Sequence, residues 1–461
     1  MLKSFEVDCR RVQPHRIGVI YHLIKTGDAS EGTTCFASAC QGGTDLAKRA
    51  RYAFGKARFA YEATVRAVAE LRGLSGAVAQ FVVGLDAASR EIGTDPWVFA
   101  PAYRLARELT LRPRKGLTID GKRDNPVLGL TYHVGEDYAH LLSGLRHIYE
   151  AVDFFKLHAG DRLGHAIALG ADVEPWMTRR RLGSLPIQEW IENYLWAWKV
   201  SLSAPTKLSQ HTKRLEASIL LLAQEIYGTL DGLTVDKLYK AYVDKAMDYE
   251  HIQRIGQEVI HQARGAGCPK TWGWGDCFED GGVAEYFPCL SHRENSNPGH
   301  NWTVRELTMS HHCAFFKYRM NREIVRELSV EDAELIRELQ IMVRQMVAQN
   351  GIIVETNPSS NVLIGDLNGM LGHHILSLRK HEGEPPVMAS INTDDPSVFA
   401  TTVANEHANI YHALIHAGYT REIAANMVDN IRQTGMDTSF IKGEISLANV
   451  LSDYEEILRC L

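Results

Sequence analysis

The stretch Ile391-Asn392-Thr393-Asp394-Asp395-Pro396 places two adjacent carboxylates after an apolar run that begins at Val387 and before a proline. This pattern is typical of a buried strand that delivers two acids at its carboxyl end. Because successive strand residues point to opposite sides, one acid can bind a metal ion while the other accepts a hydrogen bond from a ligand. An isolated Asp-Asp-Pro is more commonly a solvated turn in which aspartate caps a helix that begins at the proline, so the residues upstream decide.

The composition of the 461-residue chain is that of an ordinary globular protein. Hydrophobic residues make up 45% of it and the formal net charge is -6, and neither value favours a nucleic-acid or membrane partner. The eight cysteines are sparse and irregularly spaced, which fits reduced thiols better than a disulfide framework. Since the first residues lack the apolar core of a signal peptide and no membrane-length apolar run occurs, we expect a cytoplasmic protein.

Short apolar runs alternate with helical periodicity in two parts of the chain. Six runs indicate strands, at residues 17–24, 79–85, 127–132, 162–169, 351–355 and 387–393. Polar residues stand in or just after them, namely Asp86, His133, Glu136, His165, Asn357, Asp394 and Asp395. Because strand carboxyl ends converge on one face of a barrel, this arrangement predicts an α/β protein, an incomplete (β/α)8 TIM-type barrel with about six of the eight strands.

The alternation stops between residues 171 and 350, where helical periodicity dominates and seven of the eight tryptophans lie. We therefore divide the chain into the first part of a barrel (1–170), a helical insertion (171–350), and the last barrel strands with C-terminal helices (351–461). So much aromatic area predicts a small core of the insertion's own or a packing surface for another subunit. At its end, the cap-like Ser329-Val330-Glu331-Asp332 introduces a helix over residues 330–349.

Four short motifs stand at the ends of the expected strands. They are His133-Val134-Gly135-Glu136, Arg162-Leu163-Gly164-His165, Pro358-Ser359-Ser360-Asn361 and Asp394-Asp395-Pro396. They resemble the His-x-Gly-Glu, Arg-x-Gly-His, Pro-x-Ser-Asn and Asp-Asp-Pro motifs of the adenosine and AMP deaminases, metal-dependent barrels of the amidohydrolase superfamily. The motifs stand in the family order, and the resemblance spans about residues 17–417 without the insertion.

The resemblance implies hydrolytic deamination, in which water replaces the exocyclic amine of adenosine or an adenine nucleotide. His133 and Asp394 would bind a Zn²⁺ ion, which lowers the pKa of its water. Glu136 would be the catalytic acid that protonates ring N1, a role that needs a carboxyl whose pKa is raised by burial. His165 would orient and deprotonate the water that the metal binds, with Asp394 completing the catalytic group.

The resemblance also implies a set of substrate contacts. Asp395 would hold the purine at N7, and Gly135 would lie against the substrate. Ser89 stands where relatives carry a purine-contacting glycine, in the run Asp86-Ala87-Ala88-Ser89-Arg90-Glu91, which replaces their Asp-x-Ala-Gly-x-Glu.

Each candidate residue alone has an ordinary structural alternative. A single histidine such as His133 or His165 is more often hydrogen-bonded than metal-bound, and Glu136 could start the following helix, where its charge suits the helix dipole. The basic residues between 112 and 123 could cradle a phosphate, although a solvated loop is the more common outcome. The cysteines and histidine between 268 and 292 lack the spacing of a zinc knuckle, which favours free thiols.

One departure from the family is large. The first family strand ends in His-x-His, which supplies two metal ligands, but this sequence contains no His-x-His; before His133 it has only His15 and His22. The chain therefore resembles the C-terminal part of a large antiphage deaminase, RADAR-type or CRISPR-associated, whose relatives carry helical insertions for assembly. We expect a homo-oligomer, with a missing N-terminal segment or a partner ATPase as further partners. The alternative is a catalytically inactive, incomplete subunit that acts as an oligomeric scaffold.

Overall fold

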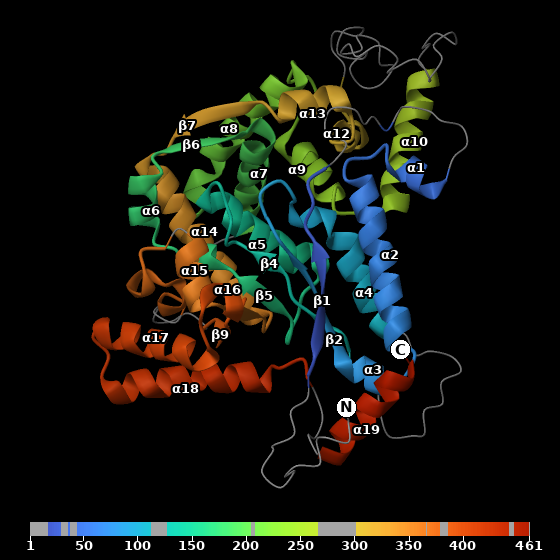
Figure 1. Ribbon diagram of the computed structural model, residues 1–461. Helices are drawn as coiled ribbons and strands as arrows, with labels where there is room; N and C mark the ends of the chain where they lie inside the picture. Colours follow the sequence, from blue (N-terminus) through green and yellow to red (C-terminus); the bar gives the residue numbers. More distant parts are fainter. Residues whose placement is uncertain are drawn as a thin grey trace.

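The computed structural model describes nine parts of the chain: residues 17–28, 36, 44–111, 127–203, 208–265, 301–365, 367–378, 386–441 and 447–460. They form a mixed α/β protein in which parallel strands lie among helices (Figure 1). This confirms the predicted α/β class. The basic segment 112–123 and the cysteine-containing segment 268–292 lie outside the described residues.

Two parallel sheets contain the strands that carry the motifs. The first has the order β1 (Val19–Ile24), β2 (Val82–Ala88), β3 (Gly129–Leu130), and the second β4 (His133–Val134), β5 (Arg162–His165), β8 (Ile353–Thr356), β9 (Met388–Ile391). Only two residues separate β3 from β4, and the amide of Thr131 donates to Leu85 while the carbonyl of Tyr132 accepts from Gly164. The strands therefore follow one another in sequence order, and their carboxyl ends lie at the same edge, which we call the rim.

The second strand begins later than its sequence predicts. Residues 79–81 belong to helix α3 (Gly76–Phe81), because the hydroxyl of Ser75 caps the helix by accepting from the amide of Val78 (3.2 Å). Strand β2 then runs on to Ala88, so Asp86 lies inside the strand and not after its end. All of β2 up to Ala87 is buried, as expected for a parallel strand covered on both faces.

Long helices cover these strands. They are α2 (Gly55–Arg72), α4 (Ala100–Leu111), α5 (Leu141–Phe155) and α14 (Val330–Gln349). Helix α5 is apolar on most sides and almost entirely buried. Helix α14 begins with the predicted cap: the Ser329 hydroxyl accepts from the amide of Asp332, whose carboxylate accepts from the amide of Ser329. This confirms the expected helix and its start.

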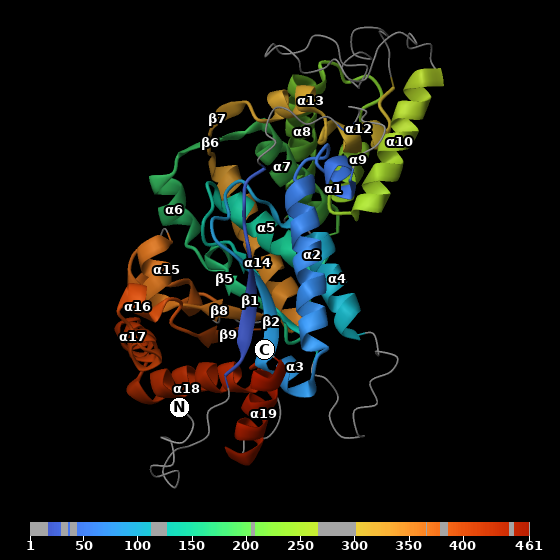
Figure 2. The same ribbon diagram turned by 45° about the vertical axis from the view of Figure 1, so that its right-hand side comes forward.

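The segment between β5 and β8 forms a largely helical region, although these two strands are neighbours in the sheet. Its helices are α6 (Val173–Arg179), α7 (Ile187–Ser203), α8 (Thr212–Tyr227), α9 (Val235–Asp244), α10 (Tyr249–Gly265), α12 (Val304–Ser310) and α13 (Ala314–Met320). Most of them gather at one end of the molecule in both views (Figures 1 and 2). An antiparallel pair, β6 (Leu182–Pro186) with β7 (Glu323–Glu327), was not expected from the sequence.

The described tryptophans of this region are interior residues, and Trp272 and Trp274 lie outside the described residues. Trp190, Trp196 and Trp302 are each 1% exposed, and they belong to the same continuous hydrophobic core as Leu85 of β2 and Leu163 of β5. The expectation of a separate small core is therefore wrong, because the helices bury their aromatic side chains against the rest of the protein. These three tryptophans offer no surface to another subunit.

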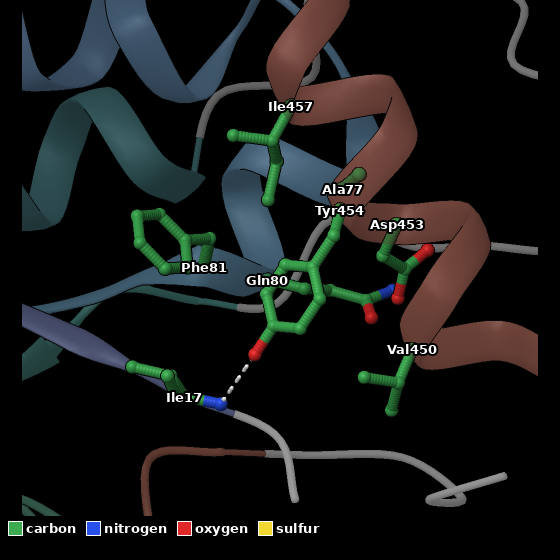
Figure 3. Close-up of a pocket in the computed structure, with 8 residues that line it drawn as sticks. All are labelled: Ile17, Ala77, Gln80, Phe81, Val450, Asp453, Tyr454 and Ile457. Atoms are coloured by element: carbon green, nitrogen blue, oxygen red, sulfur yellow. Dashed lines mark hydrogen bonds between the residues drawn. The ribbon is translucent and has the colours of Figure 1, made fainter. Parts of the chain in front are cut away.

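Four helices of the described chain follow β9. They are α16 (Pro396–Phe399), α17 (Val403–His416), α18 (Arg421–Asp437) and α19 (Leu447–Cys460). Helices α16 and α17 are separated at Ala400, whose φ is +49°. Helix α19 lies on α3, and the hydroxyl of Tyr454 accepts from the amide of Ile17, just before β1 (3.1 Å, Figure 3).

Shorter elements complete the described chain: α1 (Asp45–Arg49), α15 (Pro358–Ile364), η2 (Pro96–Val98), η3 (Ile167–Leu169), η4 (Leu208–His211), η6 (Met370–Gly372) and η7 (His374–Leu376). Among the described helices, none has both the length and the apolar character needed to cross a bilayer.

Candidate functional site

The rim collects most of the residues singled out from the sequence. His133 opens β4, His165 closes β5, and Asp394 follows β9. Glu136 lies in the loop after β4, and Asp86 lies in β2, the strand that pairs with β3. Parallel strands present their carboxyl ends at one edge, so segments far apart in sequence supply neighbouring side chains there.

A buried carboxylate orients His133. Nδ1 of the His133 ring lies 2.8 Å from Oδ2 of Asp86, a residue that is 1% exposed. Nδ1 of His22 on β1 lies 3.4 Å from the same oxygen. The angle between the N–H at Nδ1 of His133 and Oδ2 of Asp86 does not fit a hydrogen bond, so the contact between the two groups is mainly electrostatic. The other oxygen of Asp86 accepts from the amide of Ala87 (2.7 Å). Nε2 of His133 is thereby left for another partner.

A second cluster surrounds His165, whose ring centroid lies 4.7 Å from that of His133. Nδ1 of the buried His165 is 3.1 Å from Oε1 of Glu136 and 2.7 Å from the amide nitrogen of Asn361. Asn361 also donates to Oε1 of Glu136 (3.0 Å). The structure thus brings His165 and Glu136 together, as the resemblance implies, and adds Asn361 as their common partner.

Asp394 is held from the loop after β8. Its Oδ2 accepts from the hydroxyl of Ser360 (2.7 Å). The preceding Ser359 is itself fixed, because its amide (2.8 Å) and hydroxyl (2.6 Å) donate to the buried carboxylate of Glu406 on α17. Asp395 is exposed and its side chain makes no cap hydrogen bond to α16, so the capping alternative for this residue is wrong.

A carboxylate from the segment after β2 accepts two backbone hydrogen bonds from the loop after β4. Oε2 of Glu91, which is buried, accepts from the amide of Gly135 (2.7 Å), and its Oε1 accepts from the amide of Glu136 (3.2 Å). Gly135 has a φ of +77°, and a Cβ there would come within 2.6 Å of Ile148. Only glycine fits this position without strain.

Left-handed backbone is concentrated at the rim. In the described chain seven residues other than glycine have positive φ, and four of them end or follow β2, β5 and β9: Ser89 (+88°), His165 (+62°), Ala166 (+49°) and Asp394 (+55°). Such conformations cost energy and gather where a structure fixes side chains for a task. The exposed Ser89 occupies backbone space that favours glycine, which explains physically why a glycine would suit this place.

Burial and neighbouring charges shift the pKa values of three side chains at the rim: His133, Asp86 and Glu136. Burial opposes a charge on His133, but Asp86 outweighs it and raises the pKa of His133 to about 9. Burial likewise opposes ionisation of Asp86, yet His133 and then His22 and Lys25 lower its pKa. For Glu136, burial raises the pKa, but the hydrogen bond and charge of His165, the hydrogen bond from Asn361 and the charge of His133 together outweigh burial, so the net shift is downward. The expectation of a raised pKa for Glu136 is therefore wrong in this arrangement.

Several site residues were not found from the sequence. His22 was set aside because it forms no His-x-His, yet the register of β1 against β2 places it opposite Asp86. Lys25, three residues after His22 and directly after β1, is buried and donates from Nζ to the carbonyl of His133. Glu91, Asn361 and Glu406 act through backbone or side-chain hydrogen bonds that only the fold creates.

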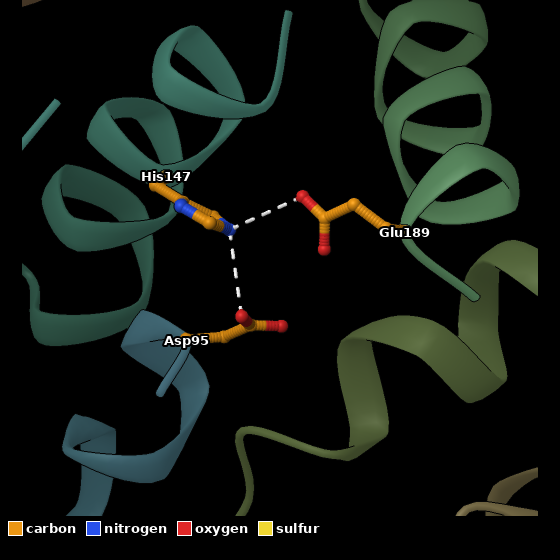
Figure 4. Close-up of side chains that lie close together, drawn as sticks. All are labelled: Asp95, His147 and Glu189. Carbon is orange, nitrogen blue, oxygen red and sulfur yellow. Dashed lines mark ion pairs between the residues drawn. The ribbon is translucent and has the colours of Figure 1, made fainter. Parts of the chain in front are cut away.

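One group of side chains in the described ranges has the spacing of a metal site. Donor atoms of Asp95, His147 and Glu189 all lie within 4.8 Å of one another (Figure 4), and this group could hold a metal ion. Burial raises the pKa of Asp95 to about 8 and lowers that of His147 to about 3. The expected ligands His133 and Asp394 do not belong to this group.

Comparisons with known proteins add no family. No family model matches the chain, and no curated protein matches it.

Proposed function

We propose that this chain carries most of an incomplete (β/α)8 barrel that deaminates adenosine or an adenine nucleotide with the help of a Zn²⁺ ion at the rim. The observation that carries the proposal is the pair of neighbouring imidazoles, each with a carboxylate at Nδ1: His133 with Asp86, and His165 with Glu136. The six strand positions in sequence order, all parallel, and the left-handed residues at the rim support it.

Two of the residues present suit a zinc ion. A metal-binding histidine commonly gives its second ring nitrogen to a carboxylate, and His133 does so with Asp86. Asp394 uses one oxygen for Ser360, which leaves the other for a metal. Zinc needs about four ligands, so the remaining ones would come from outside the described residues. Among the described strands none pairs with the outer edge of β1 or of β9, where further strands would complete a barrel.

When bound, the ion would supply water activated near neutral pH. The ring of His165 would orient that water and take up its proton, with Nδ1 held between Oε1 of Glu136 and the amide nitrogen of Asn361. Because the pKa of Glu136 is lowered, its carboxylate would first receive the proton released by the water through His165 and then pass it to ring N1 of the purine, with Asn361 keeping the carboxylate aligned. The exposed Asp395 would hold the base either by donating a hydrogen bond from a protonated carboxyl to N7, which is an acceptor, or through a bridging water.

The scaffold alternative keeps one observation in its favour. Within the described ranges, no three donor atoms at the rim lie as close together as a metal requires. A subunit that had lost catalysis would show this arrangement, and the large buried helical region would then serve assembly alone.

A metal and turnover experiment separates the two functions. The purified chain is analysed for zinc and assayed by the absorbance change that accompanies conversion of adenosine, AMP or ATP to the inosine form. Turnover that falls at least about 100-fold in Glu136→Gln, with unchanged zinc content, supports the deaminase. Asp153→Asn, an exposed change on α5, is the control and should leave both unchanged. Full zinc occupancy with no turnover on any of the three substrates would sink the proposal.

A further inference from the structure

A trio of side chains away from the rim comes from three separate elements. Asp95 precedes η2, His147 lies in the second turn of α5, and Glu189 lies in the first turn of α7 (Figure 4). Nε2 of His147 is 3.5 Å from Oδ1 of Asp95 and 3.7 Å from Oε1 of Glu189. The three side chains point toward one another across the space between the helices.

These separations suit a tetrahedral metal. Ligand atoms about 2.1 Å from a zinc ion lie about 3.4 Å from one another in a tetrahedron, close to the two distances in the trio. One imidazole and two carboxylates form a donor set that zinc accepts. The side chains of Asp95 and Glu189 are each 18% exposed and that of His147 is 10% exposed, so one side stays open for ion entry and a water ligand.

The charges around the trio do not balance. Behind it lie two fully buried cations, Arg146 and Lys245, and these face four carboxylates: Asp95, Glu150, Glu189 and Glu192. With all four carboxylates ionised, as in a metal-bound state, the negative charges exceed the positive ones by two in this largely buried region. Uncompensated buried charge is costly, and one divalent cation would offset it.

The guanidinium of Arg146 would compete with a metal ion, because it already contacts two of the three proposed ligands. Its Nη2 lies 2.9 Å from Nε2 of His147 and 2.8 Å from Oε1 of Glu189. The guanidinium has other partners, however: Nε donates to Asn193 (2.8 Å), and Nη1 donates to Glu150 (2.7 Å) and Glu192 (3.1 Å). Because the guanidinium is rigid, an ion that takes the place of Nη2 requires the whole group to shift, and Asn193, Glu150 and Glu192 remain beside it as acceptors.

We propose that Asp95, His147 and Glu189 bind a structural divalent metal ion, best matched by Zn²⁺, that ties α5 beside the strands to α7 of the helical region. This second site is independent of the proposed deaminase function. The ion would join three elements that are distant in sequence, and its binding energy would add to the stability of the folded chain.

The experiment uses the full chain in a His133→Ala background, which removes the imidazole proposed for the rim. After dialysis against Zn²⁺ and removal of free ion, mass spectrometry of the metal should find about one ion per chain. Adding Asp95→Asn, which preserves the side-chain shape, should bring the content close to zero, with folding checked by circular dichroism. Adding Asp153→Asn instead is the matched control on α5. Should Asp95→Asn fail to fold, Glu189→Gln takes its place.

Chelation gives a second readout. Removing the ion should lower the thermal midpoint of the His133→Ala chain but leave that of the His133→Ala/Asp95→Asn chain unchanged. The proposal is overturned if the His133→Ala chain binds no Zn²⁺, or if the ion stays bound after Asp95→Asn. None of these readouts needs turnover, so an inactive chain that still holds the ion would refute the deaminase function and leave this site standing.

Discussion

Replacing Asp86 by asparagine should destabilise the metal-free chain at pH 6 by about 3 kcal/mol, and far less at pH 9.5. Asparagine keeps the shape of the side chain and can still accept from the amide of Ala87, so the change removes mainly the negative charge beside His133. Burial of His133 then acts unopposed, and the pKa of its ring should fall below the ordinary value of 6.5.

The magnitude follows from the pKa of His133, which folding raises from 6.5 to about 9. Each pKa unit corresponds to about 1.4 kcal/mol, so the interaction is worth about 3 kcal/mol; the side chain is only 23% exposed, which limits screening. A histidine whose pKa is higher in the folded state stabilises fully below pH 6.5, and this contribution is lost as the pH rises through about 9.

The assay is a double-mutant cycle measured by urea unfolding after chelation. Asp86→Asn, His133→Gln and the double variant are compared at pH 6 and pH 9.5, which isolates the coupling between the two residues. The same cycle with His22→Gln is the control, because His22 is 47% exposed and 3.4 Å from Asp86, so its coupling should be smaller. A coupling below about 0.5 kcal/mol at pH 6, or one that does not change with pH, would refute the assignment of Asp86 as the group that sets the charge of His133.

Two further changes test the backbone and the packing around the strands. Ser89→Gly should stabilise the chain by about 1 kcal/mol in urea unfolding, because φ at Ser89 is +88°, whereas Ala88→Gly beside it should destabilise; a less stable Ser89→Gly would show that this conformation is not strained. Gly129→Ala should cost about 2 kcal/mol, because the new methyl group would lie 2.4 Å from the ring of Phe440, and Gly27→Ala, which meets nothing within 4 Å, is the control. In a Phe440→Ala background, Gly129→Ala should change the free energy of unfolding very little. If Gly129→Ala lowers this free energy equally with and without Phe440, the contact with Phe440 is ruled out as the cause.

Local sequence signals predicted the elements that local interactions determine. The apolar run before Asp394 forms β9, and the cap at Ser329 starts α14 where the sequence placed it. The pair of β6 and β7 could not be predicted in this way, because its two short strands stand about 140 residues apart and each is half exposed. Nothing within either strand indicates its partner, since only the packed helices between them bring the two together.

At the rim, too, local sequence signals predicted some features, while others depend on the tertiary structure. Motif spacing identified His133, Glu136, His165 and Asp394, which lie in β4, in the loop after β4, at the end of β5 and just after β9. The pKa of Glu136 could not be predicted, because its direction depends on whether burial or the contact with His165 is stronger. A lone residue such as His22 carries no spacing signal, and its role depends on the register of β1 against β2.

The energetic costs at the rim bear on the choice between catalyst and scaffold. Three charged residues from the segments before β3 hold β4 and the loop after it. Lys25 binds the carbonyl of His133 and Asp86 lies beside its ring, while Glu91 binds the amides of Gly135 and Glu136. Burying these charges is unfavourable, and burial lowers the pKa of Lys25 although four nearby carboxylates oppose the shift. The left-handed backbone at His165 and Asp394 adds strain. A subunit that only supports assembly needs none of these costs, since apolar residues would hold the same strands with less penalty, so their presence together at one rim favours the catalytic proposal.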